Sequence, residues 1–319
     1  MKKIIVVIGP GRSGTSVVTR GLQVLGVSLG NRLMPPKRGV NDKGFWEDQD
    51  IYALNRAIFK KIRHDWNLLR PVPALALRQP NLESLKSRAK EIVRCRLQSA
   101  STFGMKDPQI TRLLPFWQEV FGSMGVQAGY VLACRNPMSV AQSLSRYTGL
   151  TLKRAYLIWF EFTLASLIHT KGLERVVVNY ESLLRDSLGQ LERIGSALGL
   201  KIDAMGRELH EYRHGFLDRE LCHAEYGMAD LRASNAVPRH VVALYELILS
   251  LASDPAVVAG GDAAARIAEP SRLSGIKPEQ DRYLMDRRPG SRQGVKARSK
   301  ETEYAAGGRD GIRHARCAD

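Results

Sequence analysis

The sequence lacks long apolar runs, metal-type cysteine spacing and any recognisable nucleic-acid-binding module. No uninterrupted apolar stretch reaches ~18 residues, so we expect no transmembrane helix, with a peripheral membrane contact left open. The four cysteines, Cys95, Cys134, Cys222 and Cys317, show neither C-x-x-C nor zinc-ligand spacing. This pattern predicts free thiols in a reducing, cytoplasmic compartment, and no bound metal.

The chain is strongly basic, with a net charge of +16. Such a charge fits a nucleic-acid binder, a protein that binds acidic ligands, or a generally basic proteome. No basic stripe interleaved with aromatic residues is present, and we therefore predict no specific nucleic-acid partner. The other two explanations stay open.

Segments rich in Val, Ile and Leu alternate with segments of helical periodicity. Strands are predicted at 3–8, 102–105, 128–133 and 174–179. Helices are predicted at 14–26, 48–62, 82–99, 109–121, 137–147, 151–170, 181–199 and 237–252, of which 151–170 is apolar enough to be a core helix. This alternation predicts an α/β fold with a mainly parallel β-sheet flanked by helices.

The composition changes near residue 268. Beyond it Arg, Gly, Ser and Pro replace most large apolar residues. We predict a single domain over residues 1–268 and a mostly disordered basic tail over residues 269–319.

The loop GPGRSGTS follows the first predicted strand. Gly9, Gly14 and Ser16 fit the NTPase pattern G-x-x-x-x-G-K-[ST], but Thr15 replaces the lysine and Arg12 lies three residues earlier. A strand, a glycine turn and a helix N-terminus together form an anion site from backbone N–H groups.

Three other interpretations of this loop compete. A dinucleotide fingerprint needs an acidic residue ~20 positions later, yet no Asp or Glu precedes Asp42. A P-loop nucleotide or small-molecule kinase needs the missing lysine and an acidic residue at a strand end, and neither 128–133 nor 174–179 ends in Asp. A glycine-rich turn without a ligand is the third interpretation.

Anion-binding side chains follow all four predicted strands. Arg12, Lys106, Arg135 and Tyr180 come shortly after the successive strands. Ligands of open parallel sheets bind beyond the carboxyl ends of the strands, so these side chains are expected at one edge. The predicted site is rich in anion-binding groups and poor in carboxylates that hold metals.

These residues resemble the sulfotransferases that use 3′-phosphoadenosine 5′-phosphosulfate (PAPS), in particular a bacterial, carbohydrate-type branch. That family has a P-loop-like fold and a 5′-phosphosulfate loop in which a basic residue precedes Ser/Thr-Gly-Thr-Thr/Ser. Its 3′-phosphate motif places Pro two positions, and Ser eight positions, after an Arg. The matching residues are Gly11, Arg12, Ser13, Gly14, Thr15 and Ser16 for the loop, and Arg135, Pro137 and Ser143 for the second motif.

The resemblance implies in-line transfer of a sulfuryl group from PAPS to a hydroxyl or amine, leaving PAP. Arg12 would stabilise the leaving oxygen of the 5′-phosphate, Thr15 and Ser16 would bind the phosphate, and Lys106 would lie near the sulfuryl oxygens. Tyr180 matches a Tyr-Glu-x-Leu element near the adenine. No match is found to the glycine-rich C-terminal segment with which the cytosolic branch clamps its nucleotide.

The resemblance also implies a carboxylate general base and a glycan or glycolipid acceptor. The candidates for the base are Glu47, then Asp107, then Asp42 or Asp48. Glu47 could instead be a solvated carboxylate in the first turn of the helix at 48–62, and Asp107 could cap the helix at 109–121. Residues 31–75 and the helices after 200 are expected to shape the acceptor cleft, where Trp46 and Trp66 could stack on a sugar.

Overall fold

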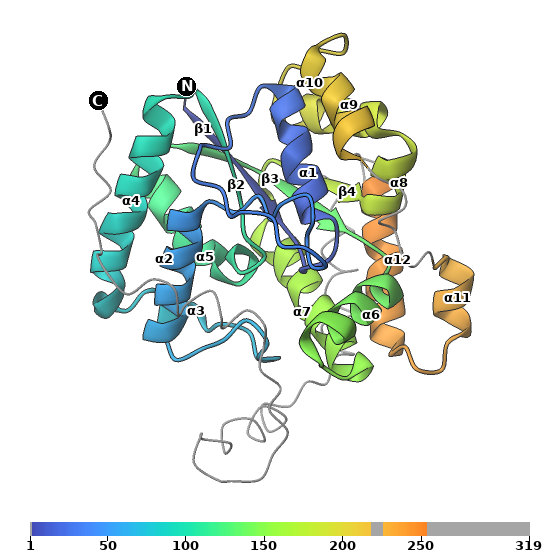
Figure 1. Cartoon of the computed structure of the whole chain (residues 1–319). Helices are drawn as coiled ribbons and strands as arrows, with labels where there is room; N and C mark the ends of the chain where they lie inside the picture. Colours follow the sequence, from blue (N-terminus) through green and yellow to red (C-terminus); the bar gives the residue numbers. More distant parts are fainter. Residues whose placement is uncertain (1, 218–225, 254–319) are drawn as a thin grey trace.

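The computed structural model describes residues 2–217 and 226–253 (Figure 1). The predicted tail at 269–319 and the predicted domain boundary near 268 lie outside the described residues, as do Cys222 and Cys317. Neither Cys95 nor Cys134 forms a disulfide among the described residues. Within the described ranges, no helix combines the length and the apolar character needed to cross a membrane.

One parallel sheet of four strands runs through the centre of the molecule (Figure 1). The strands lie in the order β2 (Thr102–Lys106), β1 (Lys3–Ile8), β3 (Gln127–Cys134) and β4 (Arg175–Asn179). The four predicted strands and the predicted α/β class are thus confirmed.

Alternation along β1 divides the apolar core between the two faces of the sheet. Ile4, Val6 and Ile8 belong to one buried cluster, and Ile5 and Val7 to the other. Side chains of a strand point alternately to opposite faces, so a strand buried on both sides must be apolar throughout. This explains why β1 consists almost entirely of β-branched residues.

The face of Ile5 and Val7 is covered by helices from the beginning and from the later part of the chain. They are α1 (Thr15–Gly21), the 3₁₀ turn η1 (Leu22–Leu25), α8 (Tyr180–Arg185), α9 (Ser187–Leu198), α10 (Arg207–His210) and the π-helical turn η3 (Glu211–Phe216). Tyr212 of η3 is fully buried and donates a hydrogen bond to the carbonyl of Val17, 3.1 Å away. This contact ties η3 to the helix that follows the glycine loop.

The other face carries the larger core. It is built mainly by α2 (Gln49–Lys61), α4 (Glu83–Gln98), α5 (Ile110–Ser123), α6 (Pro137–Thr148), α7 (Leu152–His169) and α12 (Arg239–Ser253), with the short elements α3 (Ala74–Leu77), η2 (Pro80–Leu82) and α11 (Met228–Ala233) at its margin. Eleven residues of α7 are buried, among them Trp159 and Phe160, which confirms the predicted core helix.

One predicted helix is wrong in a specific way. The segment predicted as a single helix at 181–199 forms two helices that meet at Asp186. Asp186 leaves the helical region, with φ −134° and ψ 75°, and its carboxylate accepts a hydrogen bond from the backbone N–H of Gly189 at 3.0 Å. An aspartate that caps the next helix ends the periodicity locally, because its side chain satisfies a donor that a continuous helix would satisfy with a carbonyl.

Gly9, directly after β1, is the closest approach of the glycine loop to β3. Its φ is +132°, and a Cβ atom there would lie 2.4 Å from the carbonyl oxygen of Ala133. Gly11 of the same loop has open space around its Cα. The two glycines therefore form a matched pair in which only one position requires the absence of a side chain.

We predict that Gly9→Ala lowers the free energy of unfolding by about 2–4 kcal/mol, because backbone strain and a clash with β3 both arise. Gly11→Ala should change it by less than about 1 kcal/mol. Urea unfolding of both variants checks this. Equal stabilities of the two variants would contradict the role given to Gly9.

Candidate functional site

The carboxyl ends of the four strands bring the predicted side chains to one edge of the sheet. The loop after β1 is folded tightly: Gly14 has φ +82°, and a Cβ on it would lie 2.3 Å from the ring of Tyr180. Ser13 is fully buried, and its hydroxyl has no hydrogen-bond partner in the part of the chain that the structure describes. The ring of Tyr180, the first residue of α8, thus packs directly against the glycine loop at Gly14.

Arg12 joins this loop to α6. Its φ of +70° is unusual for a residue other than glycine, and its Nε donates to the hydroxyl of Ser143 at 2.9 Å. Its guanidinium also lies over the ring of Tyr147, with Cζ 5.9 Å from the centroid. Burial, followed by the nearby charge of Arg135, lowers the pKa of Arg12. Arg12, Arg135 and Ser143 therefore share one region, as the sequence predicted.

Arg135 extends from the end of β3 over the ring of Tyr180, with Cζ 4.6 Å from the centroid. Its Nε lies 3.8 Å from a carboxylate oxygen of Glu181. The ring of Tyr180 is thus buried between Gly14 and Arg135. The structure gives Tyr180 a positioning role, and a direct contact between Tyr180 and a nucleotide stays a prediction.

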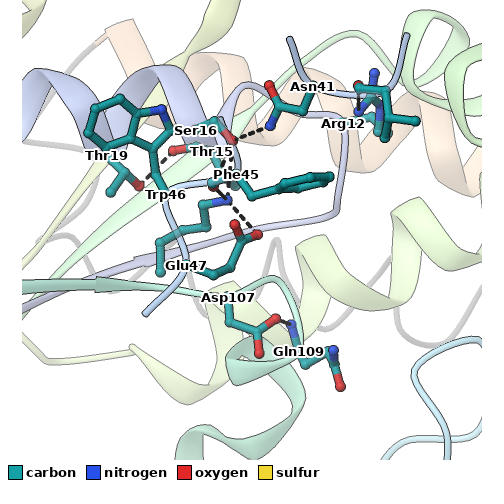
Figure 2. Close-up of polar contacts among 12 residues, drawn as sticks. Arg12, Thr15, Ser16, Thr19, Asn41, Phe45, Trp46, Glu47, Asp107 and Gln109 are labelled. Carbon is teal, nitrogen blue, oxygen red and sulfur yellow. Dashed lines mark hydrogen bonds and ion pairs between the residues drawn. The ribbon is translucent and has the colours of Figure 1, made fainter. Parts of the chain in front are cut away.

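Residues 40–47 form a segment that covers the glycine loop (Figure 2). The carbonyl of Val40 accepts a hydrogen bond from Arg12 Nη1 at 2.9 Å. Asn41 donates to the hydroxyl of Ser16 at 3.1 Å, and that hydroxyl donates to the carbonyl of Phe45 at 3.1 Å. We call residues 40–47 the covering segment.

Lys106, at the end of β2, forms a buried ion pair with Glu47. The Nζ atom lies 2.6 Å from Glu47 Oε1 and donates to Ser16 Oγ at 3.2 Å and to the carbonyl of Phe45. Lys106 is 2% and Glu47 6% exposed. Glu47 precedes α2, which begins at Gln49, so the interpretation of Glu47 as a solvated carboxylate in a first helical turn is wrong.

The carboxyl group of Glu47 titrates near neutrality. Burial raises its pKa from 4.5 to about 7, against the opposing influence of the Lys106 charge and hydrogen bond. Its Oε2 atom is buried and has no hydrogen-bond partner among the described residues. One oxygen is thus held by Lys106, and the other can accept a proton.

Asp107 has a structural role in the described network. Its carboxylate accepts hydrogen bonds from Asn55 Nδ2 at 2.8 Å and from the backbone N–H of Gln109 at 2.9 Å. Burial raises the pKa of Asp107, and the hydrogen bond from Asn55 opposes this rise. Asn55 in turn accepts from Trp117 Nε1 at 2.9 Å. These bonds fix the turn that carries Lys106. The N-cap of α5 is Gln109 and not Asp107, so the expected capping role of Asp107 is wrong.

The two remaining carboxylate candidates are engaged elsewhere. Asp48 caps α2 through the backbone N–H groups of Asp50 and Ile51, and pairs with Arg96 at 2.7 Å. Asp42 accepts from the backbone N–H of Gly39 at 2.7 Å. Neither residue lines the cavity beside the ion pair. The geometry thus favours Glu47 among the candidate bases.

A cavity of about 140 Å³ lies beside the Lys106–Glu47 pair. Its lining contains seven of the residues that the sequence singled out: Gly11, Arg12, Thr15, Ser16, Glu47, Lys106 and Asp107. Five other predicted residues lie outside the lining: Ser13, Gly14, Arg135, Ser143 and Tyr180. They are connected to it through the glycine loop and through Arg12, which is hydrogen-bonded to Ser143.

The rest of the lining agrees with the expected acceptor cleft only in part. Trp66 belongs to the lining, whereas Trp46 packs edge-on against Phe216 with centroids 5.6 Å apart. Among the described residues, the expected region 31–75 contributes to the lining, α6 and α7 contribute as well, and no helix after 200 does. Sequence reasoning did not single out Asn41, Gln109 or the aromatic residues of α6 and α7. In the described part of the chain, no group of three His, Cys, Asp or Glu side chains could hold a metal ion.

Comparison with known proteins gives distant structural likenesses. No family model and no curated protein matches the sequence. The chain is similar to the sulfotransferase domain of the olefin synthase from Synechococcus PCC 7002, at 18% identity, with 78% of this chain and 94% of that chain covered and a TM-score of 0.47. It is also similar to the sulfotransferase domain from the curacin biosynthetic pathway, at 16% identity, with 69% and 80% covered and a TM-score of 0.40. Likenesses this distant assign no activity, so function rests on the site itself.

The raised pKa of Glu47 predicts a specific pH dependence of stability. The folded protein binds this proton more tightly than the unfolded chain, whose carboxyl has the ordinary pKa of 4.5. Protonation of Glu47 therefore contributes about 3 kcal/mol to the free energy of unfolding. This contribution is fully present below pH 4.5 and is lost as the pH rises to about 7.

Glu47→Gln should remove this contribution. The difference in the free energy of unfolding between wild type and variant should change with pH between about 5 and 7 and be constant above about 8. Urea unfolding across this range measures it. A difference that is independent of pH would show that Glu47 does not titrate as described.

Proposed function

We propose that this protein is a sulfotransferase that moves a sulfuryl group from PAPS to an acceptor hydroxyl and releases PAP. The observation that carries the proposal is the meeting of Arg12, Arg135 and Ser143, which come from three separate elements. Burial, and then the charge of Arg135, lower the pKa of Arg12. An anion shared by these two guanidinium groups would offset their mutual repulsion, and arginine is well suited to bind a phosphate. A nucleotide with a 3′-phosphate supplies such an anion.

The second half of the donor would lie along the glycine loop. Thr15 and Ser16 line the cavity, as does Lys106, whose Nζ contacts Ser16. Hydroxyl and ammonium groups at this position suit the oxygens of a 5′-phosphosulfate. PAPS would supply an activated sulfuryl group, with the bridging oxygen of its phosphate as the leaving atom.

The residues of the chain then divide the chemistry. Glu47 Oε2 takes the proton of the acceptor hydroxyl as its oxygen bonds to sulfur, while the bond from sulfur to the 5′-phosphate oxygen breaks. Arg12 stabilises the negative charge that develops on this leaving oxygen, and Lys106 stabilises the sulfuryl oxygens. Lys106 must exchange part of its contact with Glu47 for the sulfuryl group. Glu47, in a buried site, then becomes a stronger base.

The alternative is a P-loop kinase that lacks the usual lysine. A kinase would bind ATP-Mg and have no need of Arg135 and Ser143 for a 3′-phosphate. The resemblance of the sequence alone favours a glycan or glycolipid as acceptor, and the acceptor hydroxyl would enter the cavity beside Glu47.

We predict that PAP stabilises the protein and that ATP-Mg does not. At a PAP concentration 100 times the Kd, stabilisation should reach about 2.7 kcal/mol. Arg135→Ala should weaken PAP binding about 10- to 100-fold, because a charge-assisted hydrogen bond is lost. Arg146→Ala, at an exposed position on α6, is the matched control and should bind PAP as wild type.

Thermal shift and calorimetry measure both effects. Stabilisation by ATP-Mg without stabilisation by PAP would refute the sulfotransferase proposal. Wild-type PAP affinity in Arg135→Ala would instead show that the 3′-phosphate lies elsewhere.

We predict that Glu47→Gln lowers the rate of sulfuryl transfer by about 10²- to 10⁴-fold while PAP affinity changes little, because a general base is lost. In the wild type, kcat should rise with pH through about 7, since only the ionised carboxyl can accept the proton. Radiolabelled PAPS and a pH series measure this. A fully active variant would place the base at another residue.

A further inference from the structure

The cavity walls opposite the ion pair are apolar. Side chains from three separated parts of the chain form these walls: Met34, Tyr52, Trp66, Leu144, Ile158 and Phe162. Ile158 and Phe162 belong to the core helix α7, and both are 2% exposed. Such walls gain free energy when they cover an apolar group, and the hydrogen-bonding groups of these six side chains are limited to the hydroxyl of Tyr52 and the indole N–H of Trp66.

Most polar side chains in the lining already have partners within the protein. The carboxylate of Asp107 accepts from Asn55 and from the backbone of Gln109. Thr148 donates to the carbonyl of Leu144 at 2.7 Å. Lys106, Ser16 and Asn41 are joined in the network around the covering segment. Few of these groups could bind a ligand with several hydroxyls without first breaking a hydrogen bond within the protein.

Two buried oxygens in the lining accept no hydrogen bond from the described residues. They are Glu47 Oε2 and Gln109 Oε1, on side chains that are 6% and 9% exposed as whole residues. Glu47 and Gln109 both line the cavity. These two oxygens could accept hydrogen bonds from the reacting hydroxyl and from one further donor. A sugar ring carries several hydroxyls, and each one that is buried without a partner would cost about 1–3 kcal/mol.

The size of the cavity indicates the size of the group that fits inside it. Its volume is about 140 Å³, close to the ~150 Å³ of an engineered apolar cavity that binds benzene. A single six-membered ring or a short alkyl chain has this size.

We propose that the acceptor is an apolar alcohol whose hydroxyl is carried on a single ring or a short hydrocarbon chain, rather than a glycan. This inference rests on the proposed function, because the hydroxyl reacts at Glu47. Its oxygen bonds to sulfur, its proton passes to Glu47 Oε2, and PAP leaves with the electron pair of the broken bond. The apolar skeleton lies against Trp66 and the α7 side chains.

Cyclohexanol and myo-inositol form a matched pair of acceptors, since they share a six-carbon ring and differ in the number of hydroxyls. With radiolabelled PAPS, cyclohexanol and benzyl alcohol should be sulfated with a kcat/KM at least about tenfold above that of myo-inositol or glucose. Binding of the same four compounds is measured by calorimetry with and without PAP. This binding assay shows whether the cavity prefers apolar alcohols to sugars even where no transfer is detected.

Trp66→Ala tests the apolar wall. It should raise the KM for benzyl alcohol about tenfold while kcat and PAP affinity stay within about twofold, and Trp66→Phe should recover most of the loss. Leu75→Ala truncates an apolar side chain that is 79% exposed and outside the cavity, and should change none of these values.

The proposal is overturned if myo-inositol or glucose is preferred, or if neither apolar alcohol binds the protein or accepts sulfate. Stabilisation of the protein by PAP distinguishes a failure of the acceptor proposal from a failure of the proposed function. Stabilisation by PAP with a preference for sugars removes only the acceptor proposal. Failure of PAP to bind removes the proposed function, while the calorimetry without PAP still decides whether the cavity takes apolar alcohols.

Discussion

The pairing of β1 with β2 on one side and with β3 on the other is the constraint on which the site depends. The parallel register places the last residues of all four strands at one edge. Gly9 leaves β1 in contact with the backbone of Ala133, so the glycine loop begins against β3. From there Arg12 reaches Ser143 of α6. Residues distant in sequence thus meet because of strand pairing.

Much of this was predictable from sequence because it follows from short-range patterns. Runs of β-branched residues marked the strands, and the spacing of Arg135 and Ser143 placed them together. Periodicity could not show the break at Asp186, where a single side-chain cap ends one helix and begins another. The short elements α3, α10 and η3 are also missing from the predictions, because few residues contribute to their periodicity.

The environment of the carboxylates could not be predicted from sequence. Glu47 was expected near a helix start, where such residues are commonly solvated, but long-range packing buries it against Lys106. Asp107 was expected as a base or a helix cap, and a buried partner, Asn55, supports the structural role. The apolar walls of the cavity come from α6, α7 and the segment around Trp66, which have no sequence signal in common. Only the tertiary structure shows them as one surface.

The covering segment contacts both halves of the site at once. The carbonyl of Val40 holds Arg12, which the donor would contact, while Phe45 and Glu47 border the cavity into which the acceptor would enter. Two ligands that each bear on the same short segment cannot bind independently. If the first ligand changes the affinity for the second by some factor, the second ligand changes the affinity for the first by the same factor, because linkage is reciprocal. Substitutions within residues 40–47 should therefore alter this mutual influence as well as the separate affinities.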